Sequence, residues 1–212
     1  MLEIGLVFQI VDLSSKTNHM ELLGAPKDKE KSQKEFIMKK WKDSLVDSEK
    51  LEKIAAEENR FYDGQSPFPH AVFDGVFEDD LLEEVITEFS QTDKGWRDFR
   101  TKYEHKSQQC MDENLGHITR QLIHTLNSSL FLTFLTQLTG IRGLIPDPYL
   151  AGGGLHKISR GGKLGIHVDF NKHKSMNVFR RINVIIYLNK NWKNKYGGQL
   201  ELWDKNKTQM VK

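Results

Sequence analysis

The stretch Gly165-Ile166-His167-Val168-Asp169 decides how we interpret this chain, because it places an imidazole and a carboxylate two residues apart. On a β-strand alternate side chains share a face, so His167 and Asp169 would lie together with Cα atoms about 6.6 Å apart. Both could then bind one metal ion, as two of the three ligands of a non-haem iron facial triad. On spacing alone, a hydrogen-bonded His–Asp pair without metal is the simpler interpretation.

The segments around this stretch predict a sheet. Residues 180–192 read RRINVIIYLNKNW, a β-branched run on which Arg181, Asn183, Ile185 and Tyr187 would share a face. Glycine pairs at 161–162 and 197–198 mark turns. The predicted strands are Leu155–Ile158, Leu164–Val168, Ile182–Leu188 and Leu200–Trp203.

The first part of the chain predicts helices instead. One follows a cap at Asp79 or Asp80, a second covers 115–126, and a third runs from a Ser128 or Ser129 cap to an αL glycine, Gly140. A short strand is predicted at His70–Phe73. Helices followed by strands indicate an α+β layout with a sandwich or barrel core.

Residues 1–60 are interpreted as a charge-rich N-terminal extension, partly helical or disordered, and 61–212 as the main domain. Met1–Leu13 is expected to form an edge strand or a terminal extension, without features of a secretory signal. Trp96, Phe99 and Tyr103 are expected to anchor a connecting segment.

Composition excludes several classes of protein. Cys110 is the only cysteine, which rules out a disulfide scaffold, and no stretch is long and apolar enough to span a membrane. Residues 152–212 hold 13 Lys and Arg against 3 Asp and Glu, so this third of the chain could attract an anionic ligand. Nucleic acid is not expected as a partner, because charge is balanced in the polar run 27–60.

The chain from about 149 to 204 resembles the prolyl-hydroxylase branch of the 2-oxoglutarate/Fe(II)-dependent oxygenases, most closely the subgroup that includes ribosomal-protein prolyl hydroxylases. The resemblance rests on the glycine turns, the His-x-Asp spacing, the strand ending Tyr187-Leu188-Asn189-Lys190, and Gly197-Gly198-Gln199-Leu200. It implies a double-stranded β-helix (jelly roll) core with preceding flanking helices.

The resemblance also implies roles for residues. His167 and Asp169 match the first two iron ligands, and Tyr187 matches the tyrosine that faces the distal carboxylate of 2-oxoglutarate. Ile185 and Leu200 match apolar walls of that pocket. The implied cofactors are Fe(2+), 2-oxoglutarate and O2, with ascorbate as a further expectation.

Two weaker assignments concern the substrate. Arg180 occupies a position that can lie at the substrate mouth in relatives, and His156 is expected to line the pocket or to pack. The substrate is a peptidyl proline or a small molecule, and the expected localisation is cytoplasmic. The sequence does not fix the oligomeric state.

The sequence departs from this family in one respect. The family takes a second histidine ligand, and then a basic residue for 2-oxoglutarate, from later strands, whereas no histidine follows His173 here. We therefore expect a domain incomplete at its C-terminus and an inactive fragment. His173 is a possible substitute ligand. The alternatives are a non-catalytic jelly-roll binding module and a fragment that does not fold fully.

Overall fold

The computed structural model describes residues 3–12, 45–110, 112–207 and 210–211. Its helices are α2 (Ser48–Tyr62), α3 (Asp79–Gln91), α4 (His117–Leu126) and α5 (Ser129–Thr139), with short 3-10 helices η1 (Asp112–Asn114) and η2 (Asn194–Tyr196). Its strands are β1 (Glu3–Asp12), β2 (Arg97–Arg100), β3 (Glu104–Gln109), β4 (Leu144–Pro146), β5 (Gly154–Ile158), β6 (Lys163–Leu164), β7 (Lys172–His173), β8 (Val178–Tyr187), β9 (Leu202–Trp203) and β10 (Met210–Val211).

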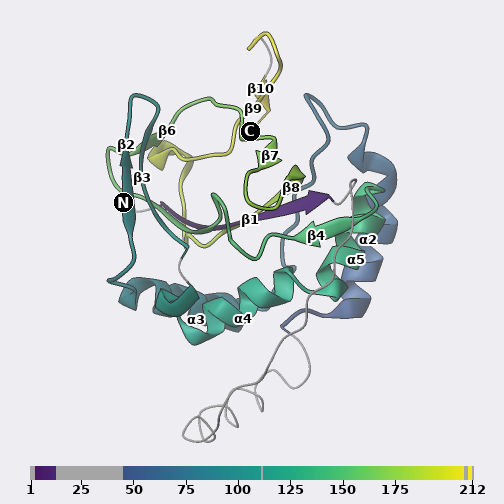
Figure 1. Ribbon diagram of the computed structural model, residues 1–212, viewed down its shortest axis with the longest axis horizontal. Coiled ribbons are helices and arrows are strands. Elements are labelled where there is room, and N and C mark those ends of the chain that lie inside the picture. The colour runs from purple at the N-terminus through teal and green to yellow at the C-terminus, as the bar shows by residue number, and fades with distance from the viewer. Residues whose placement is uncertain (1–2, 13–44, 111, 208–209, 212) are drawn as a thin grey trace, which may run out of the picture.

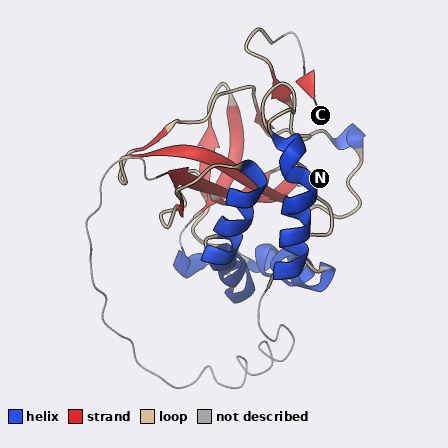
Figure 2. Cartoon of the chain, turned by 90° about the vertical axis from the view of Figure 1, so that its right-hand side faces the viewer, coloured by secondary structure: helices blue, strands red, loops and turns tan. Residues whose placement is uncertain are grey.

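The strands and helices form two layers. An eight-stranded sheet has the order β2-β3-β5-β1-β8-β7, with β4 paired to β1 and β6 to β3, and every pairing is antiparallel. The helices gather on one side of this sheet (Figures 1 and 2). The α+β class is therefore confirmed. The jelly-roll core stays a prediction, because the described strands form this one sheet and a separate β9–β10 pair.

The core lies between the helices and one face of the sheet. On β8 the even-numbered side chains from Val178 to Ile186 are buried or half-buried, and Asn183 and Tyr187 face the other way. Ile182 and Ile186 join Leu155 of β5 and the apolar faces of α3, α4 and α5 in one cluster. The alternation expected for β8 is thus present from Ile182 to Tyr187, but it does not extend to Arg181, which the pairing with β1 skips.

The helix ends follow from local chemistry. Ser128 caps α5 through its Oγ, which accepts from the Phe131 N–H at 3.4 Å, and Gly140 ends the helix at φ 70°, as expected. The capping prediction for α3 is wrong by one residue or more, since Glu78 is the N-cap and Asp79 is already helical. α4 is capped from outside: the Glu88 carboxylate of α3 accepts from the N–H groups of Ile118 and Thr119.

The N-terminal strand is a correction to the sequence analysis. β1 is not an edge strand, because it pairs with β5 on one side and with β8 on the other. An edge position was inferred because nothing local distinguishes a central strand from an edge. The boundary drawn between residues 60 and 61 also falls inside α2, while most of the charge-rich run before it lies outside the described residues.

Two further expectations differ from the structure. Residues 70–73 form no strand, although one was expected there. The connecting segment that Trp96, Phe99 and Tyr103 were expected to anchor contains the β2–β3 hairpin. The strand expected at Leu164–Val168 is limited to Lys163–Leu164, which pairs with β3. Beyond Gly165, whose N–H donates to the Tyr103 carbonyl at 2.8 Å, the described chain gives this segment no ladder partner.

Candidate metal centre

His167 and Asp169 are brought together although the segment that carries them is not a strand. His167 Nε2 lies 3.4 Å from Asp169 Oδ1, and both side chains are about half exposed. The expected proximity of the two side chains is therefore present, but the reason given for it, strand alternation, is wrong, and their role as metal ligands stays a prediction. The segment stays irregular because ladder hydrogen bonds require a neighbouring strand.

The second nitrogen of His167 fixes what Nε2 can do. Nδ1 lies 2.8 Å from the Gly165 carbonyl, which can only accept, so we assign the ring proton to Nδ1. The lone pair of Nε2 then faces a carboxylate oxygen, an arrangement that a shared cation would stabilise. This backbone-oriented imidazole is the usual arrangement of a metal-ligating histidine.

The separation also fits a shared ion. Two ligand atoms each about 2.0–2.2 Å from one ion lie roughly 3.0 Å apart at a right angle, and farther apart at wider angles. The 3.4 Å between Nε2 and Oδ1 is compatible with such a site. A nitrogen and a carboxylate oxygen are also ligands that suit Fe(II).

The other oxygen of Asp169 is held by two side chains of β8. Asp169 Oδ2 is 3.0 Å from Arg180 Nη2 and accepts from Asn183 Nδ2 at 2.8 Å. The guanidinium of Arg180 also donates to Asn183 Oδ1, which closes a three-residue network. These contacts occupy Oδ2 and leave Oδ1 turned toward His167.

A β-bulge makes this network possible. Arg180 and Asn183 are three residues apart and would point to opposite faces of a regular strand. The pairing of β8 with β1 skips Arg181, since Ile10 pairs with Ile182 and Val11 with Arg180. Arg180, expected at a substrate mouth, is thereby directed to Asp169, and its side chain is only 8% exposed.

Arg180 is the buried cation of the site. Burial lowers the pKa of Arg180, and the charges of Asp169 and Asp147 act in the opposite direction. Its guanidinium also lies over the Phe170 ring, 4.9 Å from the centroid. A guanidinium remains charged in such surroundings, so it pairs permanently with Asp169.

Replacing Asn183 by alanine is expected to weaken metal binding about tenfold, because outer-shell partners of a ligand typically contribute this much. The change removes one hydrogen bond from Asp169 and alters no charge. Titration with Mn(II) measures the affinity, and Asn194→Ala on η2 is the matched control. Equal affinities in the two variants would contradict the assignment of Asn183.

The other residues predicted for the site are His156, Tyr187, Ile185 and Leu200. In register, His156 of β5 pairs with Gly5 of β1, and Gly5 pairs with Tyr187 of β8. Only a glycine therefore separates the two side chains across about 10 Å of sheet. Ile185 shares the strand and face of Tyr187. Leu200 lies before β9, outside any strand, and is 45% exposed.

His156 is held neutral. Burial, with the charge of Lys106, lowers the pKa of His156 to about 4, while hydrogen bonds to the Gly153 and Gly152 backbone and the charge of Asp169 act the other way. A neutral imidazole on the open face of the sheet suits a site that also holds a cation.

This pKa predicts a pH dependence of stability. Between about pH 6.5 and pH 4 the unfolded chain binds a proton at His156 that the native protein does not, so the free energy of unfolding falls as pH falls through this window. We expect a loss of about 2 kcal/mol. Urea unfolding at pH 7 and pH 4.5 measures it for the wild type and for His156→Asn, in which this part of the pH dependence disappears.

The matched control is His124→Asn, the same substitution at an exposed histidine. If His156→Asn keeps the pH dependence of the wild type, His156 is not the group that titrates.

His173 does not take part in the metal centre. Its side chain is 3% exposed and contacts Asp147, so its suggested role as a substitute ligand is wrong for this arrangement. The described residues contain no group of three His, Cys, Asp or Glu side chains suited to a metal ion. The third ligand of a facial triad is therefore not among them.

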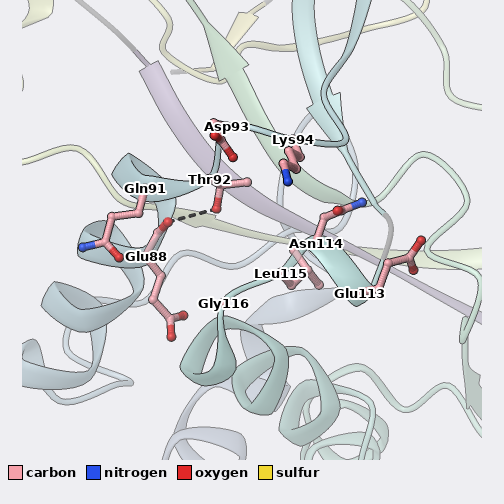
Figure 3. A pocket seen from close by; sticks show the side chains of 9 residues that line it. All are labelled: Glu88, Gln91, Thr92, Asp93, Lys94, Glu113, Asn114, Leu115 and Gly116. Carbon is pink, nitrogen blue, oxygen red and sulfur yellow. Dashed lines mark hydrogen bonds between the residues drawn. The ribbon is translucent and has the colours of Figure 1, made fainter.

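The pocket drawn in Figure 3 lies elsewhere. A cavity of about 350 Å³ is lined by the end of α3 and by residues 93–94 and 113–116 (Figure 3). Its Glu88 carboxylate points to the start of α4, where it already accepts from Ile118 and Thr119. The pocket therefore has a structural carboxylate and none of the predicted site residues.

The residues that sequence analysis missed are Asn183 as a partner of Asp169, and Asp147. Asn183 was placed on the correct face, but its contact depends on the bulge at Arg181, for which the sequence carries no signal. Within the described residues, no helix has the length and apolar character needed to cross a bilayer.

Comparison with known proteins agrees with this geometry. No curated protein and no solved structure matches the chain. Residues 153–212 match the family model described as the 2OG-Fe(II) oxygenase superfamily, and this region contains His167, Asp169 and all of β8. The match covers 60 of the 212 residues and shows that this region is similar to a superfamily whose description names 2-oxoglutarate and Fe(II).

Proposed function

We propose that this protein is a 2-oxoglutarate/Fe(II)-dependent dioxygenase of the prolyl-hydroxylase type. Its reaction hydroxylates a prolyl or related substrate with one oxygen atom of O2, and the other atom enters succinate as 2-oxoglutarate loses CO2. The observation that carries the proposal is the orientation of His167, whose Nδ1 is bound to Gly165 and whose Nε2 faces Asp169 Oδ1.

The residues have distinct tasks in this proposal. His167 Nε2 and Asp169 Oδ1 hold Fe(II), which supplies oxygen activation when bound. Arg180 and Asn183 keep Oδ2 occupied and so present Oδ1 to the ion. The Tyr187 hydroxyl donates a hydrogen bond to a carboxylate of 2-oxoglutarate, and Ile185 and Leu200 form apolar walls of the 2-oxoglutarate pocket. His156 faces the substrate, and ascorbate serves as an additional reductant.

Succinate formation tests the proposal. The protein is loaded with Fe(II) and 2-oxoglutarate without oxygen, and succinate is followed after oxygen is admitted. We expect Fe(II) binding that is lost in His167→Ala, and turnover above that of free iron only where a third ligand completes the site, since the described residues do not supply one. Metal or 2-oxoglutarate binding without succinate would instead favour the binding module, and absence of metal binding would overturn the proposal.

A further inference from the structure

A second histidine–aspartate pair lies inside the fold, away from the exposed face that carries His167. His173 and Asp147 are 2% and 0% exposed, and His173 Nε2 is 3.3 Å from Asp147 Oδ1. Asp147 follows β4, and His173 is the last residue of β7. A buried carboxylate is retained only when donors surround it, so these contacts hold the two segments together.

The carboxylate of Asp147 is satisfied on both oxygens. Oδ1 accepts from the Tyr149 N–H at 2.9 Å and Oδ2 from the Ala151 N–H at 2.7 Å, which shapes the loop between β4 and β5. The Tyr149 ring also packs on the His173 ring, with centroids 5.9 Å apart. The loop therefore offers one fixed acceptor to the β7–β8 hairpin.

The tautomer of His173 follows from its other nitrogen. Nδ1 accepts from the Met176 N–H at 3.1 Å, so it carries no proton and Nε2 must be the donor. Nε2 is fully buried and makes no hydrogen bond of regular geometry with the described residues, and it contacts Asp147 Oδ1 at 3.3 Å. His173 is thus hydrogen-bonded to the turn of the hairpin through Nδ1 and in contact with Asp147 through Nε2.

The same hairpin adjoins Asp169, one candidate ligand of the metal centre. β7 pairs with β8 through Lys172–Phe179 and His173–Val178, and the Arg180 N–H donates to the Asn171 carbonyl at 2.9 Å. Asp169 precedes β7 and Arg180 lies in β8, and the two side chains are 3.0 Å apart. Fixing His173 therefore fixes the backbone on both sides of the Asp169–Arg180 contact.

We propose that Asp147 and His173 are positioning residues of the metal centre, which lock the β7–β8 hairpin to the loop before β5 and thereby hold Asp169 in place for metal binding. The inference rests on the proposed function, because it assigns the pair to the same metal site. It differs from a ligand role, since the ring of His173 is buried, with Nδ1 bonded to the Met176 N–H and Nε2 against Asp147.

Two amide substitutions separate positioning from packing. In His173→Gln the amide nitrogen can replace Nε2 as the donor to Asp147, whereas in His173→Asn it is too short to do so. We expect His173→Asn to weaken Mn(II) binding about tenfold and His173→Gln to stay within about threefold of the wild type. Val85→Ala creates a cavity in the core beside α3 and so controls for loss of stability alone. It should leave the Mn(II) affinity unchanged.

The outcomes are distinguishable. If His173→Asn binds Mn(II) as well as Val85→Ala does, while His167→Ala does not bind, the positioning role is wrong and the metal centre stands. If the wild type does not bind Mn(II), the proposed function and this inference both fail. Nitrogen NMR of the metal-free wild type tests the pair without any variant: Nε2 is expected to carry the proton, and a proton on Nδ1 would overturn the inference.

Discussion

Replacing either His167 or Asp169 by alanine is expected to abolish divalent metal binding, with a loss of affinity of at least about a hundredfold. Each of the two side chains supplies one of the acceptors that face each other at 3.4 Å. Removing one leaves a single protein ligand there among the described residues, and one ligand does not retain a labile divalent ion. The loss exceeds that of Asn183→Ala, which affects only the orientation of Asp169.

The measurement is anaerobic titration with Co(II) or Mn(II), read from the absorption of bound Co(II) or from free Mn(II). Asp169→Asn is informative, because it keeps the size of the side chain and the possibility of a hydrogen bond to Arg180 and removes the charge. We expect it to bind metal far more weakly than the wild type. Unchanged metal stoichiometry in His167→Ala or Asp169→Ala would remove the pair from the site.

The chain contains a natural control for this experiment. His124 Nε2 lies 3.5 Å from Asp112 Oδ1, and Arg120 contacts the same carboxylate at 3.1 Å. This surface group at α4 contains the same residue types as the candidate site: a histidine, an aspartate and an arginine. It differs in that His124 is not oriented by a backbone carbonyl, as His167 is by Gly165. His124→Ala is expected to leave metal binding unchanged, which tests whether orientation rather than proximity makes the site.

The sequence predicted this pair better than it predicted the structure around it. The two-residue spacing and the flanking glycines pointed to His167 and Asp169, although the segment is irregular beyond Gly165. Local patterns also placed β5, β8, α5 and its Ser128 cap, because apolar periodicity and capping act within a few residues. The short strand at 163–164 was overextended because a pattern does not reveal where the partner strand ends.

Non-local contacts account for what could not be predicted. β1 enters the sheet between β5 and β8, two strands more than 140 residues away along the chain, and the order of strands is not encoded in any single segment. The contacts of Arg180 and of His173 likewise depend on a bulge and on a loop that follows β4. For His173 the sequence offered only the residue type, and a histidine near Asp169 suggested a ligand where the fold buries a hydrogen-bonded ring.

Tyr187→Phe is expected to weaken 2-oxoglutarate binding about ten- to hundredfold and to leave metal affinity unchanged. The proposal gives the Tyr187 hydroxyl a carboxylate oxygen as acceptor, and a hydrogen bond to a charged group contributes about 1.5–3 kcal/mol. Tyr187 lies on the open face of β8 with Ile185 and is 48% exposed, so removal of one oxygen leaves the core intact. Its effect on stability should therefore be small.

The two affinities must be measured separately for this prediction to discriminate. Mn(II) is titrated first, and 2-oxoglutarate is then titrated into the Mn(II)-loaded protein by calorimetry. Tyr103→Phe, at another exposed tyrosine, in the β2–β3 turn, is the matched control and should retain wild-type affinity for both. If Tyr187→Phe binds 2-oxoglutarate as the control does, the hydroxyl does not hold the cosubstrate. A parallel loss of Mn(II) affinity would instead mean that the substitution disturbs β8 and, through Asn183, the contact with Asp169.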